Sequence, residues 1–192
     1  MNTNFTPQGS PLERKTPSSM HAGMGHARKE LADWLRDAHA MEVQAEAMLK
    51  GQAARLEHYP KLKSRIEQHI TETRRQARDV EQCLQSMGQD TSALKDTGGK
   101  AMAMMQAVGG IVMGDEVIKG ILAGYSFEHM EIASYTILIA AAEAAGEHEI
   151  ASVCERILGE EQAMAAWLSA HTGEVVRQYL AREEIPGLDS KR

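Results

Sequence analysis

Apolar residues recur at steps of three and four along most of this chain, and that spacing constrains the fold more than any other feature. In the first such stretch the recurring residues are Leu31, Trp34, Leu35, Ala38, Met41, Ala45, Met48 and Leu49. Similar stretches cover about 60–87, 115–145 and 147–171. No segment alternates with period two, and no hairpin signal separates the apolar runs. The sequence therefore predicts an all-α protein with four long amphipathic helices.

Proline and glycine mark where these helices begin and end. Pro60 lies where a first helical turn tolerates proline, and Gly88 and Gly146 follow apolar stretches as C-terminal glycines do. Residues 89–99 are rich in turn formers and predict a connector. The Met-rich segment 100–114, which two consecutive glycines interrupt, predicts an additional short helix packed across the others. Four long helices with a long connection in the middle are typical of a four-helix bundle with a crossover.

The two ends of the chain fall outside the bundle pattern. Residues 1–26 carry Pro, Gly and Ser without apolar periodicity and are predicted to form a flexible N-terminal tail. Residues 27–171 are predicted to form the bundle, and residues 172–192 a C-terminal helical extension and tail. The end of the N-terminal tail brings together Met20, His21, Met24 and His26. Thioethers and imidazoles bind copper, but we interpret this stretch as a flexible segment without a role.

Composition narrows the class of protein. A chain of 192 residues is long enough for one domain with a real core. Its net charge of −6 argues against a nucleic-acid partner. The absence of a signal-peptide core and of a bilayer-long apolar run predicts a cytoplasmic protein with no membrane partner. Cys83 and Cys154 fit neither a disulfide framework nor a metal-binding spacing, so we expect both to be small core residues.

Acidic residues stand on the apolar side of every long helix. They are Glu42, Glu72, the pair Glu128 and Glu131, and Glu161. A single acid at the edge of an apolar stripe usually reaches solvent, but four helices each carry one near the middle. Buried carboxylates without partners cost several kcal/mol each or take up protons. Two divalent cations, with a combined charge of about +4, would nearly balance four or five carboxylates. The pattern therefore predicts a dinuclear carboxylate site of the ferritin-like kind, with two iron ions or, alternatively, two manganese ions.

Neighbouring polar residues leave several roles open. His69, three residues before Glu72, is a candidate metal ligand, a candidate hydrogen-bond partner of a ligand carboxylate, or an ordinary histidine at the core edge. Tyr135, one turn beyond Glu131, either hydrogen-bonds a ligand or satisfies its hydroxyl elsewhere. Gln76 is a candidate hydrogen-bond partner of Glu72.

Two consecutive glutamates compete for one ligand position on the last long helix. Glu160 lies off the stripe that joins Ile157 to Met164, whereas Glu161 lies on it. The spacing therefore favours Glu161 as the residue that points inward.

Four segments of the chain resemble the YciE/YciF family of bacterial ferritin-like stress proteins. They read LRDAHAMEVQAEAML, IEQHITETRRQARDVEQCL, FEHMEIASYTIL and ILGEEQAMAAWL. The Glu-His-x-Glu-Ile-Ala-x-Tyr run in the third segment is the most specific of these. The resemblance covers about residues 29–170 and implies a rubrerythrin-related bundle of about five helices, paired into a homodimer. The family is associated with stress responses.

The sequence departs from the Glu-x-x-His pattern of rubrerythrin-type metal sites. The residue three positions after Glu72 is Arg75, and the residue three positions after Glu161 is Met164. Neither side chain supplies an imidazole nitrogen. The chain also lacks a Cys-x-x-Cys pair, so a complete peroxidase cycle would need an external electron donor.

The sequence resembles this family but lacks the usual histidine ligands, and two functional hypotheses follow. The first is a di-iron or di-manganese oxidoreductase, peroxidase-like or catalase-like, that reacts with oxygen or peroxide. The second is a non-enzymatic stress-response homodimer that retains a metal-free relic of the site. A third, DNA protection by a multimeric shell, is opposed by the acidic balance of the chain. In the homodimer we expect part of Ala101–Met113, or an outer face of the first two helices, to be buried.

Overall fold

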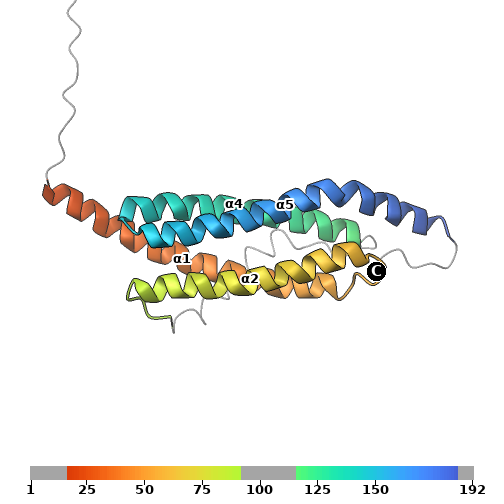
Figure 1. Ribbon diagram of the computed structural model, residues 1–192, viewed down its shortest axis with the longest axis horizontal. Helices are drawn as coiled ribbons and strands as arrows, with labels where there is room; N and C mark the ends of the chain where they lie inside the picture. Colours follow the sequence, from red (N-terminus) through yellow and green to blue (C-terminus); the bar gives the residue numbers. More distant parts are fainter. Residues whose placement is uncertain (1–16, 92–115, 186–192) are drawn as a thin grey trace, which may run out of the picture.

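Four helices form a bundle in the computed structural model, which describes residues 17–91 and 116–185 (Figure 1). They are α1 (Pro17–Ala53), α2 (Pro60–Ser86), α4 (Glu116–Ala145) and α5 (His148–Glu183). The described residues contain no strand, so the predicted all-α four-helix bundle is confirmed. The additional short helix that the sequence predicts within 100–114 lies outside the described residues.

The order of the helices in space follows from their directions. α1 and α2 are antiparallel neighbours, and so are α4 and α5 (Figure 1). α2 and α4 run in the same direction along the bundle, so the connection between them is a crossover. Glycine ends two of the helices, because Gly88 and Gly146 have φ angles of 72° and 75°, in the left-handed region that side chains disfavour.

One helix begins before the position that the sequence predicts, and another includes a predicted extension. α1 begins at Pro17 rather than near residue 27. Proline is favoured in a first turn, and single glycines in a helix cost only about 1 kcal/mol each, which a long helix tolerates. The predicted C-terminal helical extension continues α5 past His171 to Glu183, where Val175 packs into the core.

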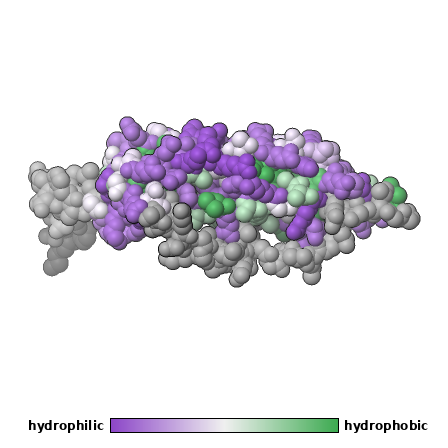
Figure 2. Space-filling model, turned by 90° about the horizontal axis from the view of Figure 1, so that it is seen from below, coloured by the Kyte–Doolittle hydropathy of each residue, from purple (hydrophilic) through white to green (hydrophobic). Residues whose placement is uncertain are grey.

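Apolar side chains pack in two clusters, one toward each end of the bundle. The first apolar cluster includes Leu31, Leu35, Val80, Leu138, Ala142 and Ile157. The second apolar cluster includes Leu49, Leu62, Ile66, Ile121, Met164 and Leu168. Cys83 and Cys154 belong to the first apolar cluster as free, buried thiols, which confirms that they are small core residues. Most of the described surface seen in Figure 2 is hydrophilic. None of the four described helices has the length and hydropathy of a membrane span.

Candidate metal centre

A buried polar layer separates the two apolar clusters, and all four helices contribute to it. Its residues, each at most 1% exposed, are Glu42, His69, Thr73, Gln76, Glu128, Glu131 and Glu161. Tyr135, which is fully buried, lies at the edge of the layer. The side chains that the sequence predicts to point inward therefore do so, except Glu72, whose side chain remains 18% exposed.

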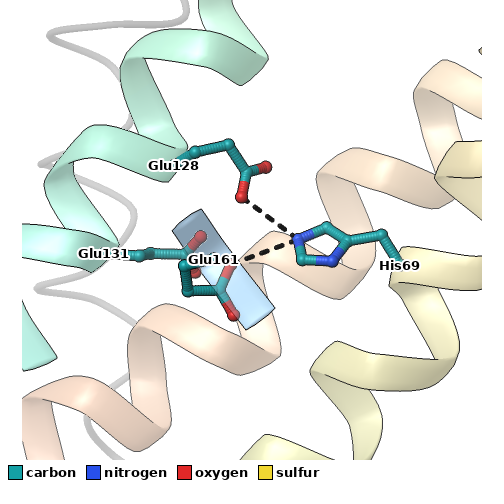
Figure 3. A group of neighbouring side chains, drawn as sticks. All are labelled: His69, Glu128, Glu131 and Glu161. Atoms are coloured by element: carbon teal, nitrogen blue, oxygen red, sulfur yellow. Dashed lines mark ion pairs between the residues drawn. The ribbon is translucent and has the colours of Figure 1, made fainter. Parts of the chain in front are cut away.

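Four residues of this layer converge on one point (Figure 3). His69 from α2, Glu128 and Glu131 from α4, and Glu161 from α5 each offer one ligand atom, and these atoms lie within 4.8 Å of one another. Glu128 and Glu131 reach the same space because residues three apart share a helix face. Carboxylate oxygens and an imidazole nitrogen are ligands that suit iron and manganese. This group of four is called the His/Glu cluster below.

Glu42 from α1 lies beside the His/Glu cluster and is positioned by a tyrosine. The Tyr135 hydroxyl donates a hydrogen bond of 2.5 Å to Glu42 Oε1. Burial, with Glu161 nearby, raises the pKa of Glu42 well above its usual range despite that hydrogen bond. Burial also raises the pKa of Tyr135, so its hydroxyl keeps its proton and remains a donor. Of the two roles open to Tyr135, the structure shows the hydrogen bond to a candidate ligand.

His69 stands between three carboxylates. Its Nε2 lies 3.2 Å from Glu128 Oε2 and 3.3 Å from Glu161 Oε2 (Figure 3), while its Nδ1 lies 2.9 Å from Glu72 Oε2. Burial alone would lower the pKa of His69, but the interactions with these three carboxylates outweigh it and raise the pKa to about 12. The raised pKa favours the imidazolium form of His69, which offsets part of the negative charge of the cluster.

Glu72 touches the His/Glu cluster only through His69. Its carboxylate is held by His69, by Gln68 at 2.8 Å and by Arg65 at 3.1 Å. These interactions, of which the one with His69 has the largest effect, lower the pKa of Glu72 to about 2. His69 and Glu72 share one side of α2, but His69 faces the bundle axis and Glu72 lies nearer its edge. The helical spacing predicts that both residues lie near the site, but it does not predict which of them is closer to the bundle axis.

Gln76 joins the cluster to a different partner from the one that the sequence predicts. Its Nε2 donates to Glu161 Oε1 at 2.5 Å and to Glu160 Oε2 at 2.9 Å, not to Glu72. The partner differs because α5 faces this part of α2. Glu160 also pairs with Arg75 and stays partly exposed, whereas Glu161 is buried in the cluster. The structure thus places Glu161, rather than Glu160, inside.

Several acceptors of the buried layer have no hydrogen-bond partner. They are Glu42 Oε2, Gln76 Oε1, Glu128 Oε2 and Glu161 Oε2; the last two lie at ion-pair distance from His69 but outside hydrogen-bond geometry. Burial raises the pKa of Glu128 to about 7 despite the nearby His69. Burial, with Glu42 and Glu161 nearby, raises the pKa of Glu131 well above its usual range. Buried acceptors without donors are costly, and cations would satisfy them. The residues present therefore fit a metal site.

Sequence reasoning missed the two residues that hold Glu72 away from the cluster. Gln68 and Arg65 precede Glu72 by four and seven residues, spacings that return to nearly the same side of a helix. A basic residue two turns before a candidate ligand is therefore the signal that would have identified Glu72 as an ion-paired carboxylate.

Comparisons with known proteins agree with this fold. Residues 26–181 match the family described as a domain of unknown function, DUF892. The crystal structure of protein XCC3681 from Xanthomonas campestris pv. campestris is 43% identical, with a TM-score of 0.71 over 83% of this chain and 99% of that one.

Two more distant structures share the fold. The stress protein YciF of E. coli is 24% identical, with a TM-score of 0.62 over 79% of this chain and 98% of that one. YcfI of Rhodopseudomonas palustris is also 24% identical, with a TM-score of 0.58 over 84% of this chain and 98% of that one. These matches confirm the resemblance to YciE/YciF-like proteins and the ferritin-like fold class.

Proposed function

We propose that this chain, which belongs to the DUF892 family, binds two divalent metal ions, iron or manganese, in its buried polar layer. The observation that carries the proposal is the set of buried carboxylate oxygens without a hydrogen bond on Glu42, Glu128 and Glu161, which surround the space shared by the His/Glu cluster; those of Glu128 and Glu161 lie at ion-pair distance from His69. Four buried glutamates would carry a charge of −4 when ionised, and two divalent ions supply the matching +4. The single imidazolium of His69 cannot balance this charge alone.

The residues divide into ligands and the groups that hold them. Glu128, Glu131, Glu161 and His69 would hold the metal, and Glu42 would complete the set from the opposite helix. Tyr135 fixes Glu42, and Gln76 fixes Glu161, so two carboxylates are oriented before any ion arrives. Hydrogen bonds of this kind typically change metal affinity by about 10- to 100-fold.

Ion binding requires the cluster to release protons. Imidazole binds a metal only in its neutral form, so His69 must give up the proton that it holds between Glu128 and Glu161. Glu72, on the opposite ring nitrogen of His69, would then accept the remaining N–H and orient the ring. Metal affinity should therefore rise with pH.

The bound ions would supply the redox chemistry, since iron in a carboxylate-rich site exchanges electrons with oxygen or peroxide. The protein's part is to exclude bulk water, which the two apolar clusters do from both ends of the layer. An external electron donor would complete the cycle. We propose that the active unit is a homodimer.

A second candidate function is favoured by one observation. His69 Nε2 lies between carboxylate oxygens of Glu128 and Glu161, where its raised pKa favours the cationic form. In that case the layer is a metal-free relic, neutralised by protons and by His69, and the chain acts as a non-enzymatic stress-response homodimer.

Metal stoichiometry separates the two candidates. Protein purified without chelators is incubated anaerobically with iron(II) or manganese(II), desalted and analysed for metal. We expect about two equivalents per chain in wild type and a loss of metal in Glu161→Gln. The matched control is Glu67→Gln, which changes an exposed glutamate outside the layer. Wild type with no more metal than Glu161→Gln would contradict the proposal. Peroxide consumption by the loaded protein then tests the reaction.

A further inference from the structure

The interface between α2 and α5 differs from the other neighbouring interfaces of the bundle. α1 packs extensively against α2 and α4, and α4 packs extensively against α5, whereas α2 and α5 make few contacts. Ion pairs bridge this interface along its length. Lys61 pairs with Glu174 at 2.8 Å, Arg75 pairs with Glu160, and Arg156 pairs with Asp79 at 2.9 Å. This line of ion pairs is called the α2–α5 seam below.

At the level of the His/Glu cluster, the seam offers a continuous polar path from solvent. The Arg75 side chain is 43% exposed and its partner Glu160 is 23% exposed. Directly beneath them lies the buried amide of Gln76, which bonds both Glu160 and Glu161. Glu161 is a member of the cluster. On this side, a chain of bonds therefore links the exposed Arg75 through Glu160 and Gln76 to the cluster.

The interface between α1 and α2 provides a contrast at nearly the same height. There Arg74 pairs with Glu46 at 2.5 Å, and the two side chains are 45% and 24% exposed. These values nearly equal those of the Arg75–Glu160 pair. Glu46 is also bound by Lys50 at the surface. The bonds of the described residues link this pair to no member of the His/Glu cluster.

We propose that the α2–α5 seam is the route by which cations reach the buried cluster, with the Arg75–Glu160 pair as its closure. The proposal rests on the metal-binding function proposed above. Exposed ion pairs contribute little to stability and are screened by salt, so this seam separates more easily than an apolar interface does. Once Arg75 moves away, Glu160 is the first carboxylate that an incoming cation meets, and Gln76 Oε1 and Glu161 follow it inward.

The test compares two double variants of equal charge. The seam variant, Arg75→Gln/Arg156→Gln, removes two pairs that bridge α2 and α5. The control variant, Arg74→Gln/Arg28→Gln, removes two pairs of similar exposure elsewhere. Manganese(II) uptake is followed by stopped flow against a fluorescent chelator. We expect at least threefold faster uptake in the seam variant than in wild type, an unchanged stoichiometry, and no change in the control. Equal uptake rates in the two variants would overturn the proposal.

The buried thiol Cys83 provides a readout that needs no metal. Burial raises the pKa of this thiol to about 11, and the seam residues Asp79 and Arg156 are the charged neighbours that also influence it. Because Arg156 lowers the pKa of this thiol, the labelling test keeps Arg156 and compares Arg75→Gln with Arg74→Gln in a Cys154→Ala background. Opening of the seam should speed the reaction of Cys83 with a disulfide reagent in Arg75→Gln, and equal labelling rates in these two variants would overturn the proposal whether or not metal binds. Wild type that binds no manganese(II) at equilibrium would instead contradict the proposed function.

Discussion

The two apolar clusters and the polar layer between them are built from the same four helices, yet they have opposite energetic characters. In the first apolar cluster, α1 and α2 contribute residues such as Leu35 and Val80, whose burial stabilises the folded state. A few turns along, α1 contributes Glu42 and α4 contributes Glu128 and Glu131, which lose hydration. The stability that the two apolar clusters provide therefore offsets the free-energy cost of burying the polar layer between them.

This comparison separates the residues that hold the bundle together from those that give it chemistry. Substitutions in the apolar clusters should destabilise the protein whether or not metal is present. Substitutions that neutralise a carboxylate of the polar layer should stabilise the metal-free protein and weaken metal binding. The predictions below test this difference.

The largest effect is expected from a cavity in the second apolar cluster. Ile66 is fully buried, and Ile66→Ala should lower the free energy of unfolding by about 2 to 5 kcal/mol, with or without metal. Urea unfolding measures it. The matched control is Ile137→Ala, which changes an isoleucine that is 53% exposed and should cost much less. Equal losses in the two variants would contradict the assignment of the core.

The second prediction concerns the pH dependence of the metal-free protein. The pKa of Glu128 is raised from 4.5 to about 7, so the stability linked to it is full below pH 4.5 and is lost as the pH rises through 7. At 1.36 kcal/mol per pKa unit, the loss is on the order of 3 kcal/mol. The raised pKa of His69 extends the decline above pH 6.5.

Glu72 opposes this trend at low pH. Its pKa is lowered to about 2, so the stability linked to it is present above pH 4.5 and is lost as the pH falls toward 2. Metal-free protein should therefore be most stable near pH 4.5. Urea midpoints measured from pH 3 to pH 9 check the maximum. Stability that rises steadily from pH 5 to pH 8 without metal would mean that the carboxylates of the layer do not have raised pKa values.

A smaller gain is expected when one carboxylate is neutralised. Burial, together with the like charges of Glu42, Glu161 and Glu128, raises the pKa of Glu131 well above its usual range. Glu131→Gln should stabilise the metal-free protein at pH 8 by on the order of 1 to 3 kcal/mol. Glu143→Gln, an exposed position on the same helix, is the control and should change little. A destabilised Glu131→Gln protein without metal would contradict the account.

The smallest effect is expected from the loss of one hydrogen bond. Tyr135→Phe removes the donor to Glu42 Oε1, which leaves both oxygens of that carboxylate unpartnered. The metal-free protein should lose about 1 to 2 kcal/mol of stability, and metal affinity should fall about 10-fold. Chemical denaturation and a metal titration measure the two losses. Tyr125→Phe, at a partly buried tyrosine on the same helix, serves as the control.

The helices were predictable because a 3.6-residue period in apolar residues leaves few other folds open. The inward direction of Glu42, Glu128 and Glu161 followed from their places on apolar stripes. The helical extension after His171 was also predicted. The start of α1 at Pro17 was not predicted, because the Pro, Gly and Ser residues of 1–26 show no apolar periodicity.

The centre of the site could be predicted only to within one helical turn. His69 and Glu72 share a side of α2, and spacing alone does not say which of them occupies the middle. The partner of Gln76 depends on which helix faces α2, a relation between distant segments that single-helix periodicity does not contain. Thus the acidic residues that point inward were predictable from sequence, whereas their partners required the packed bundle.

The central claim, that the polar layer is a cation site, is tested most directly by thermal melting of wild type and Glu128→Gln, each with and without iron(II) or manganese(II), under anaerobic conditions. An ion that binds only the folded state at a hundred times its Kd stabilises it by about 2.7 kcal/mol. We predict that metal raises the melting temperature of wild type and leaves that of Glu128→Gln almost unchanged. Wild-type melting that is indifferent to metal, together with a variant at least as stable as wild type, would show that the layer no longer holds ions.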